Sequence, residues 1–565
     1  MDYAKTTQNF RQLSANKKFA DQEDWWRGAV IYQIYPRSYQ DTTGDGIGDL
    51  AGITSRLDYV ASLGVDAIWL SPFFTSPMDD FGYDVADHCQ VDPMFGDLAS
   101  IDTLLEKAHG LGIRVMIDLV LSHTSDIHAW FKQSRSNNTN SKNDWYVWAN
   151  AKTDGTPPNN WLSIFGGSAW EWDTNRRQYY LHNFLASQPD LNFHNIDVQD
   201  AALDIARFWL DRGVDGFRLD TVNMYFHDAQ LRNNPSVDAD GPVNGIPDNN
   251  PYSFQIPQYN INRPENLTFI GRLRELMDQY PGTATVGELG AVSNMYAMTA
   301  AYTQKDQRLS MAYSFDLLSS RFSAKHIRDV VSRMEENIGD GWASYAFSNH
   351  DVQRVITRWQ LEHRSDIAPC LIALLTCLRG TPCIYQGDEL ALPDVAIARE
   401  DLRDPYGIRF WPELPSRDGC RTPMPWADDP TVGFGNVKPW LPTSKAHQEL
   451  SVERQETDRQ SVLHRTRTFL NWRKLQQVLK TGSIRFVDIE EPVIAFWRES
   501  SEDAVFCAFN LGESVQTLVL DDYVTGQSAS GFCDEIHTIK IILEPGSAFF
   551  ARKTDKPKQE TPWQA

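Results

Sequence analysis

Residues 216–220 read GFRLD, a short apolar run that carries one arginine and ends in an acidic residue. Seven further runs rich in β-branched or aromatic residues lie before and after it, separated by segments long enough to form helices. Apolar strands that alternate with helices are typical of parallel βα units, and eight of them predict an α/β fold of the (β/α)8 TIM barrel type. The eight runs are Val30–Tyr35, Ala67–Leu70, Val115–Val120, Gly216–Asp220, Thr285–Glu288, Met311–Phe315, Ala343–Ser348 and Cys383–Tyr385.

The barrel is predicted to carry an inserted lobe after its third strand and a separate domain at its end. The segment between the third and fourth runs is rich in Asn, Trp, Gly and Pro, and is too long for a plain βα loop. After the last helical stretch the chain changes to short alternating runs, which indicate an antiparallel β-domain. We therefore expect a polar N-terminal arm (1–24), the barrel (25–120 and 193–480), the inserted lobe or domain B (121–192), the C-terminal β-domain (481–553) and a disordered tail (554–565).

Composition excludes several classes of protein. The 565 residues contain 53 Lys+Arg and 75 Asp+Glu, a net charge of −22, which argues against a nucleic-acid partner because phosphate backbones require a basic face. The 7 Cys show no zinc-ligand spacing, so neither a disulfide framework nor structural zinc is expected. No stretch approaches about 18 uninterrupted apolar residues, so no membrane segment is expected. We expect a cytoplasmic monomer or homodimer that acts on a small molecule.

Three carboxylates stand at the ends of three different predicted strands: Asp220, Glu288 and Asp351. The carboxyl ends of barrel strands meet at one mouth, where barrel enzymes carry their chemistry. A single acid at a strand end is more often a helix cap or a salt-bridge partner, but three converging carboxylates are costly to bury unless the chemistry needs them. One protonated and one ionised carboxyl group are the equipment for cleaving a glycosidic bond.

The chain resembles the α-amylase superfamily of glycoside hydrolases (family 13), in its α-glucosidase and oligo-1,6-glucosidase branch, over roughly residues 25–553. Nine motifs in register carry the resemblance. They are WWRGAVIYQIYPRSYQDTTGDGIGDLAGI, GYDVADH, DLVLSHTS, QPDLN, GFRLD, VGEL, FSNHD, TPCIYQGDE and RDGCRTPMPW.

The resemblance implies a role for each carboxylate. Asp220 matches the nucleophile that forms a covalent glucosyl intermediate, and Glu288 matches the general acid/base. Asp351 matches the third carboxylate, which grips sugar hydroxyls. Arg218 lies two residues before Asp220 on the same strand face and should keep it ionised; its alternative role is an ordinary salt bridge within the barrel.

Further positions match the family's sugar-binding residues. His123 and His350 match histidines that hydrogen-bond the sugar. Asp84 and Arg417 match a pair that binds the distal hydroxyls of a terminal glucose, with Tyr83 stacked beneath it. The register of the Arg417 loop leaves Arg421 as an alternative. Phe165 is a candidate pocket wall, with plain packing as its alternative role.

The segment 41–49 is a partial EF-hand-like loop. Oxygen ligands at alternate positions, Asp41, Thr43, Asp45, the Ile47 carbonyl and Asp49, suit a hard cation. The segment resembles the Ca²⁺ or Mg²⁺ loop of this branch, in which an Asn commonly stands at the position of Thr43. We expect a structural Ca²⁺ or Mg²⁺ and no catalytic cofactor; a metal-free turn is the alternative.

Thr221 follows the predicted nucleophile and bears on the bond that is cleaved. Branch members that cleave α-1,6 bonds tend to carry Val there, so Thr favours α-1,4 action. Together with the closed pocket that Asp84, Tyr83 and Arg417 imply, the resemblance favours an exo-acting α-glucosidase on short α-1,4-linked glucosides such as maltose. The loop 231–266 should wall off longer chains. Oligo-1,6-glucosidase activity, transglucosylation and a sucrose isomerase remain alternatives. Sucrose isomerases of the superfamily can also carry Thr at this position; the Arg-rich loop typical of them is not evident, although Arg354 and Arg358 lie close after the third carboxylate. A non-catalytic relative such as a transporter heavy chain is a remote one, since such chains carry a membrane helix.

Overall fold

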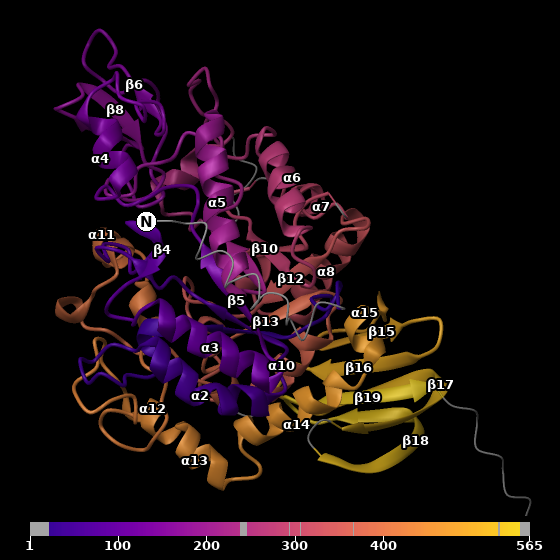
Figure 1. Cartoon of the computed structure of the whole chain (residues 1–565). Coiled ribbons are helices and arrows are strands. Elements are labelled where there is room, and N and C mark those ends of the chain that lie inside the picture. The colour runs from indigo at the N-terminus through magenta and orange to yellow at the C-terminus, as the bar shows by residue number, and fades with distance from the viewer. Residues whose placement is uncertain are drawn as a thin grey trace, which may run out of the picture.

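The eight predicted runs close into one parallel barrel in the computed structural model of the protein (Figure 1). The structure describes residues 22–553 except 238–245, 293, 306, 365–366 and 529–530, so most of the arm 1–24 and the tail 554–565 lie outside it. Around the barrel the strand order is β1-β13-β12-β11-β10-β9-β5-β2. The strands are β1 (Ile31–Ile34), β2 (Ala67–Leu70), β5 (Arg114–Leu119), β9 (Gly216–Leu219), β10 (Ala284–Glu288), β11 (Met311–Tyr313), β12 (Ala343–Ala346) and β13 (Thr381–Tyr385). The predicted fold class is confirmed.

Strand register decides which side chains fill the barrel. Arg218 of β9 pairs with Asp118 of β5 on one side and with Val286 of β10 on the other. Because side chains alternate along a strand, Glu288, two residues after Val286, points to the same interior. The lower interior is apolar, and the ring of Trp26 closes it edge-on against Trp342 at a centroid distance of 6.3 Å. Asp118, Arg218 and Glu288 thus lie above this apolar cluster.

Helices surround the barrel and are capped by local sequence. Asp49 accepts a hydrogen bond from Gly52 N at the start of α2, and Asp97 forms a capping box with Ser100 at the start of α3. The main barrel helices are α2 (Leu50–Leu63), α3 (Leu98–Leu111), α5 (Ile196–Arg212), α6 (Asn266–Met277), α7 (Met295–Tyr302), α8 (Ala324–Asn337), α10 (Ala368–Cys377) and α14 (Val462–Lys474). Within the described part of the chain, no helix combines the length and the apolar character that a bilayer crossing requires.

The segment predicted as an inserted lobe stands at one end of the barrel (Figure 1). It contains α4 (Ala129–Ser136) and a small antiparallel sheet of β6 (Trp148–Ala149), β8 (Gln178–Leu181) and β7 (Trp170–Asp173). The described parts of the loop 231–266 are fastened to it, since Asn160 and Asn234 exchange hydrogen bonds and Asn250 donates to the Ile164 carbonyl. Lobe and loop therefore form one wall.

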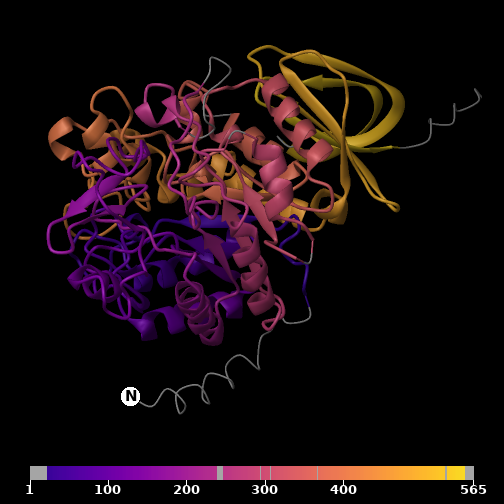
Figure 2. The same cartoon turned by 90° about the horizontal axis from the view of Figure 1, so that it is seen from above.

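The C-terminal segment forms a separate antiparallel sheet beside the barrel, drawn in yellow in Figures 1 and 2. Its strand order is β14-β15-β16-β19-β17-β18. A buried arginine, Arg498 of β15, joins this sheet to the barrel. It donates to the carbonyls of Cys377 and Leu378 at the end of α10 and to those of Leu479 and Gly482. The strands are β14 (Ser483–Phe486), β15 (Val493–Glu499), β16 (Ala504–Asn510), β17 (Gln516–Ser528), β18 (Gly531–Leu543) and β19 (Ala548–Lys553).

Candidate active site

One buried arginine organises the carboxylates at the top of the barrel. Arg218 Nη1 lies 2.5 Å from Asp220 Oδ1 and 2.8 Å from Asp118 Oδ1, and Nη2 lies 2.6 Å from Glu288 Oε2. Arg218 is fully buried, whereas the side chains of Asp220 and Glu288 are each 7% exposed. Asp220 directly follows β9 and Glu288 ends β10. The structure thus brings together two carboxyl groups that the sequence analysis assigned to the chemistry, and Arg218 contacts both.

The charges in this cluster give Asp220 and Glu288 different pKa values. Burial raises the pKa of Glu288 to about 8; Arg218 opposes the shift, and Asp220 and Asp351 add to it. Burial also raises the pKa of Asp220, to about 6, against the attraction of Arg218. The single guanidinium of Arg218 cannot neutralise the three carboxylates that contact it, so one carboxyl group tends to stay protonated. Glu288, which has the higher pKa, is the group that keeps its proton near neutral pH.

Asp351, the third predicted carboxylate, lies in the loop after β12 and faces a different pair of cations. Its Oδ1 atom lies 3.2 Å from Arg417 Nη1 and 3.0 Å from Arg421 Nη2. Burial would raise the pKa of Asp351, but the His350 ring and the two guanidinium groups lower it below its usual range. At 23% side-chain exposure it is more open than Asp220 or Glu288. Asp351 is therefore an ionised acceptor facing outward.

Tyr83 and His350 stack beside the carboxylates, at a centroid distance of 5.3 Å and an angle of 5°. Gln33 Nε2 lies 2.7 Å from His350 Nδ1, so the amide donates there and the ring proton is on Nε2, which faces Tyr83 Oη and Asp351. Tyr83 Oη lies 3.0 Å from Asp118 Oδ2. Burial lowers the pKa of His350 to about 3, so the ring is neutral.

Arg417 faces a different aspartate from the one expected. Its Nη2 atom lies 2.8 Å from Asp80 Oδ1 and 2.7 Å from Asp404 Oδ1. Asp84 is fully buried, and its carboxylate accepts from Ser76 Oγ and from the backbone amides of residues 79 and 80. The expected pair of Asp84 and Arg417 is therefore corrected: Asp84 shapes the turn that presents Asp80, and Asp80 lies beside Arg417.

His123 and Phe165 lie where the inserted lobe meets the barrel. His123 Nε2 lies 3.0 Å from the Tyr83 carbonyl, and its ring is 5.3 Å from that of Phe184. Burial lowers the pKa of His123 to about 4. The Phe165 ring lies 5.2 Å from the guanidinium carbon of Arg417. Phe165 thus packs against a group of the site.

Several residues of the site escaped the sequence analysis. Asp80 and Asp404 stand in loops without periodicity, and Tyr313, whose hydroxyl accepts from Arg218 Nη2 at 2.9 Å, is an ordinary aromatic residue in its strand. Asp118 lies near the end of the predicted run Val115–Val120, and that position could have placed it beside Arg218.

The loop 41–49 is held by turn hydrogen bonds. Asp41 accepts from Gly44 N at 2.7 Å and Gly46 N at 2.9 Å, Asp45 accepts from Ile47 N at 2.9 Å, and Asp49 caps α2. Across the residues that the structure describes, no three acidic, histidine or cysteine side chains converge as metal ligands. The carboxylate oxygens keep further lone pairs, so the donor set suits a hard cation, and the cation stays a prediction.

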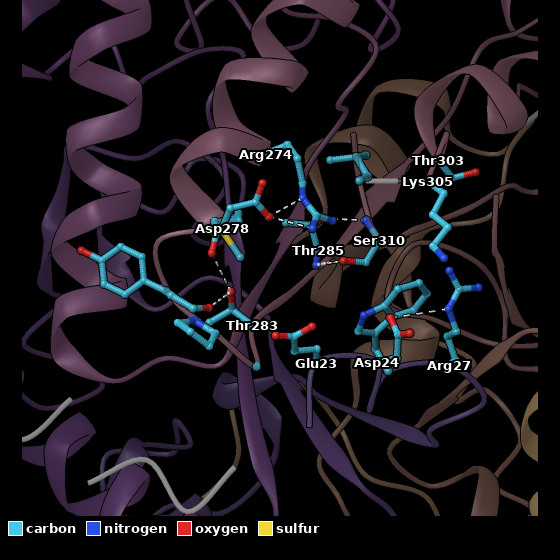
Figure 3. A pocket seen from close by; sticks show the side chains of 16 residues that line it. Glu23, Asp24, Arg27, Arg274, Asp278, Thr283, Thr285, Thr303, Lys305 and Ser310 are labelled. Carbon is cyan, nitrogen blue, oxygen red and sulfur yellow. Dashed lines mark hydrogen bonds and ion pairs between the residues drawn. The ribbon is translucent and has the colours of Figure 1, made fainter. Parts of the chain in front are cut away.

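A cavity of about 380 Å³ lies at the opposite, N-terminal end of β10 and β11 (Figure 3). Arg274 in its wall is paired with Asp278, at 2.7 Å, and the hydroxyls of Thr285 and Ser310 accept from each other's backbone amides. None of the predicted site residues lines it. This cavity is therefore separate from the carboxylate site.

Comparison with known proteins agrees with this geometry. The sequence model described as "Alpha amylase, catalytic domain" matches residues 33–482. A "Probable alpha-glucosidase" of Rhizobium meliloti is 53% identical, over 94% of this chain and 97% of its own length. An "Oligo-1,6-glucosidase" of Heyndrickxia coagulans is 36% identical, over 87% of this chain and 93% of its own. The crystal structure of an "alpha-glucosyl transfer enzyme, XgtA" superposes with a TM-score of 0.90 at 53% identity, over 94% of this chain and 99% of that one.

The chain belongs to the α-amylase family of glycoside hydrolases, family 13. Within that family it stands in the α-glucosidase and oligo-1,6-glucosidase branch, and it is an enzyme that acts on sugars.

Proposed function

We propose that the protein is a retaining, exo-acting α-glucosidase that releases α-glucose from the non-reducing end of short α-1,4-linked glucosides such as maltose. The observation that carries the proposal is the contact of one guanidinium, that of Arg218, with both Asp220 and Glu288. A shared partner keeps the two carboxyl groups close together, as retaining glycosidases require, while their pKa values lie near 6 and 8.

The reaction follows from the two protonation states, a protonated Glu288 and an ionised Asp220. Protonated Glu288 gives its proton to the glycosidic oxygen while Asp220 attacks the anomeric carbon, so the bond to the leaving sugar breaks and a glucosyl ester forms. Glu288 is then ionised and removes a proton from water, which displaces Asp220 and releases glucose with its original α configuration. If a sugar hydroxyl replaces the water, the same steps transfer glucose. The relative described as an "alpha-glucosyl transfer enzyme" supports this transglucosylation.

Exo action is proposed from the closed end of the site. Asp80, Arg417 and Asp404 form a buried ion-pair group, with Phe165 packed against Arg417. Such a group offers paired donors and acceptors to the distal hydroxyls of one glucose and leaves no path for a longer chain. The wall made by the inserted lobe and the loop 231–266 supports a preference for short substrates.

The bond specificity is proposed from Thr221, a polar residue beside the carboxylates. The oligo-1,6-glucosidase relative keeps α-1,6 cleavage as the second candidate. Sucrose isomerisation is less favoured, because Arg354 and Arg358 direct their guanidinium groups to backbone carbonyls such as those of Gln386 and Ser319.

Glucose release from maltose, isomaltose and sucrose, with the products separated by chromatography, tests the proposal, with Asp220→Ala as the control. Proton NMR of the glucose first released from 4-nitrophenyl α-glucoside reports the anomer, because this substrate contains no reducing-end glucose. Preferred maltose cleavage, abolished in the control, and α-glucose from the nitrophenyl substrate are expected. Dominant isomaltose cleavage, sucrose rearrangement or release of β-glucose from the nitrophenyl substrate would overturn it.

A further inference from the structure

Thr221 joins the two carboxyl groups and does so in a strained conformation. Its φ angle is +42°, a region that β-branched residues rarely adopt and that persists only where the surroundings enforce it. In this conformation its backbone amide donates to Glu288 Oε2 at 3.0 Å. Its hydroxyl lies 3.2 Å from Asp220 Oδ2, the oxygen that Arg218 does not hold. The orientation of the Thr221 side chain therefore bears on Asp220 directly.

A second hydroxyl reaches Thr221 from the neighbouring strand. Ser122, three residues after β5, is fully buried, and its Oγ atom lies 2.9 Å from Thr221 Oγ1 and 2.9 Å from His123 Nδ1. A buried hydrogen-bonded path thus runs from His123 through Ser122 and Thr221 to Asp220.

The direction of the protons along the path matters. Ionised Asp220 only accepts, so Thr221 must donate to it and must itself accept from Ser122. Ser122 then accepts from His123 Nδ1, while the Gln188 amide, 3.2 Å from His123 Nε2, can donate to the other ring nitrogen. The opposite order places the ring proton on Nε2, toward the Tyr83 carbonyl at 3.0 Å. Ser122 would then donate to His123 and draw the Thr221 proton away from Asp220.

We infer that Ser122 is a positioning residue for the nucleophile: its hydroxyl donates to Thr221 and so directs the Thr221 hydroxyl onto Asp220. The inference rests on the proposed function, in which Asp220 attacks the sugar. The other ionisable groups around Asp220 are Arg218 on its own strand and, from neighbouring elements, Asp118, Glu288, Asp351, Tyr83 and Tyr225.

The test is the pH dependence of kcat/KM for Ser122→Ala with 4-nitrophenyl α-glucoside. A hydrogen bond to the charged form lowers a carboxyl pKa, so its loss should move the acidic limb up by about half to one pH unit, with kcat about fivefold lower and KM little changed. Thr124→Val is the matched control. Thr124 is buried in the same segment and bonds to Tyr146 Oη at 2.8 Å and to the Ser125 carbonyl at 3.0 Å. This variant should leave the acidic limb in place.

A double-mutant cycle locates the effect. Because Ser122 is inferred to act through the Thr221 hydroxyl, Ser122→Ala should shift the limb in the wild type and not in a Thr221→Val background. A limb that moves down, does not move, or moves equally in both backgrounds would overturn the inference. Asp220→Ala separates this failure from that of the proposed function: activity in that variant overturns the nucleophile itself, whereas an inactive variant with an unmoved limb in Ser122→Ala overturns the role of Ser122 alone.

Discussion

Asp80 and Arg417, which stand 337 positions apart in the sequence, meet at 2.8 Å beside the carboxylate site. The contact joins the loop after β2 to the long loop after β13, and both side chains are largely buried. β2 and β13 both pair with β1, so the two loops rise from neighbouring parts of the barrel although they are far apart in the sequence. This ion pair joins them at the closed end of the site.

Asp80→Ala should lower kcat/KM for maltose about a hundredfold, chiefly through KM, because charged hydrogen bonds to the bound glucose are lost. Asp84→Asn is the comparison, because Asp84 holds the turn rather than Arg417. We expect Asp84→Asn to lower the melting temperature more than Asp80→Ala does. We expect it to lower kcat/KM less than Asp80→Ala does. The reverse order, at matched melting temperatures, would restore Asp84 as the sugar ligand.

The pH profile of kcat/KM should be bell-shaped, with limbs near pH 6 and pH 8. Below about 6 Asp220 is protonated and cannot attack, and above about 8 Glu288 has lost the proton that it must donate. Glu288→Gln should lose the alkaline limb together with about a hundredfold or more of the activity. An alkaline limb that persists in this variant would assign it to another group.

Thr221→Val should raise the ratio of isomaltose to maltose cleavage, because valine keeps the shape of threonine and removes the hydroxyl beside the carboxylates. Glucose release from both disaccharides measures the ratio, and Thr221→Ser, which keeps the hydroxyl, is the control. Equal ratios in all three proteins would show that residue 221 does not select the bond.

Chelation should lower the melting temperature if the loop 41–49 holds its predicted cation, and added Ca²⁺ or Mg²⁺ should restore it. The response should vanish in Asp45→Asn, which changes an exposed carboxylate of the loop. Catalytic constants per folded protein should not change. Identical melting curves with and without chelator would favour the metal-free turn.

Maltose should be cleaved with a higher kcat/KM than maltoheptaose, because the loop 231–266 is fastened to the inserted lobe and narrows the approach. Parallel initial-rate measurements decide the matter. Equal values for the two sugars would remove this loop as the gate.

The barrel strands were predictable from the sequence, and so was the position of the carboxylates that stand at their ends. Continuous apolar runs predict barrel strands, and Asp220 and Glu288 lie at strand ends, where topology alone brings them together. Asp80 could not be placed in this way, because its position depends on how the Asp84 carboxylate folds the preceding turn. The strained conformation of Thr221 also leaves no periodic signal, since its contacts come from Ser122 after β5 and from Glu288 of β10.

The buried guanidinium of Arg498 makes the C-terminal sheet a poor unit for exchange between relatives. It donates to five carbonyls: those of Cys377, Leu378 and Leu479 lie on the barrel side of residue 480, and those of Gly482 and Ser483 lie beyond it. A chimera joined at residue 480 to a sheet that lacks this arginine would leave the barrel-side carbonyls without their shared donor. Conversely, an arginine at this position without those carbonyls would be a buried charge that lacks hydrogen-bond partners. Recombination that preserves folding must therefore inherit the end of α10 and β15 from the same parent.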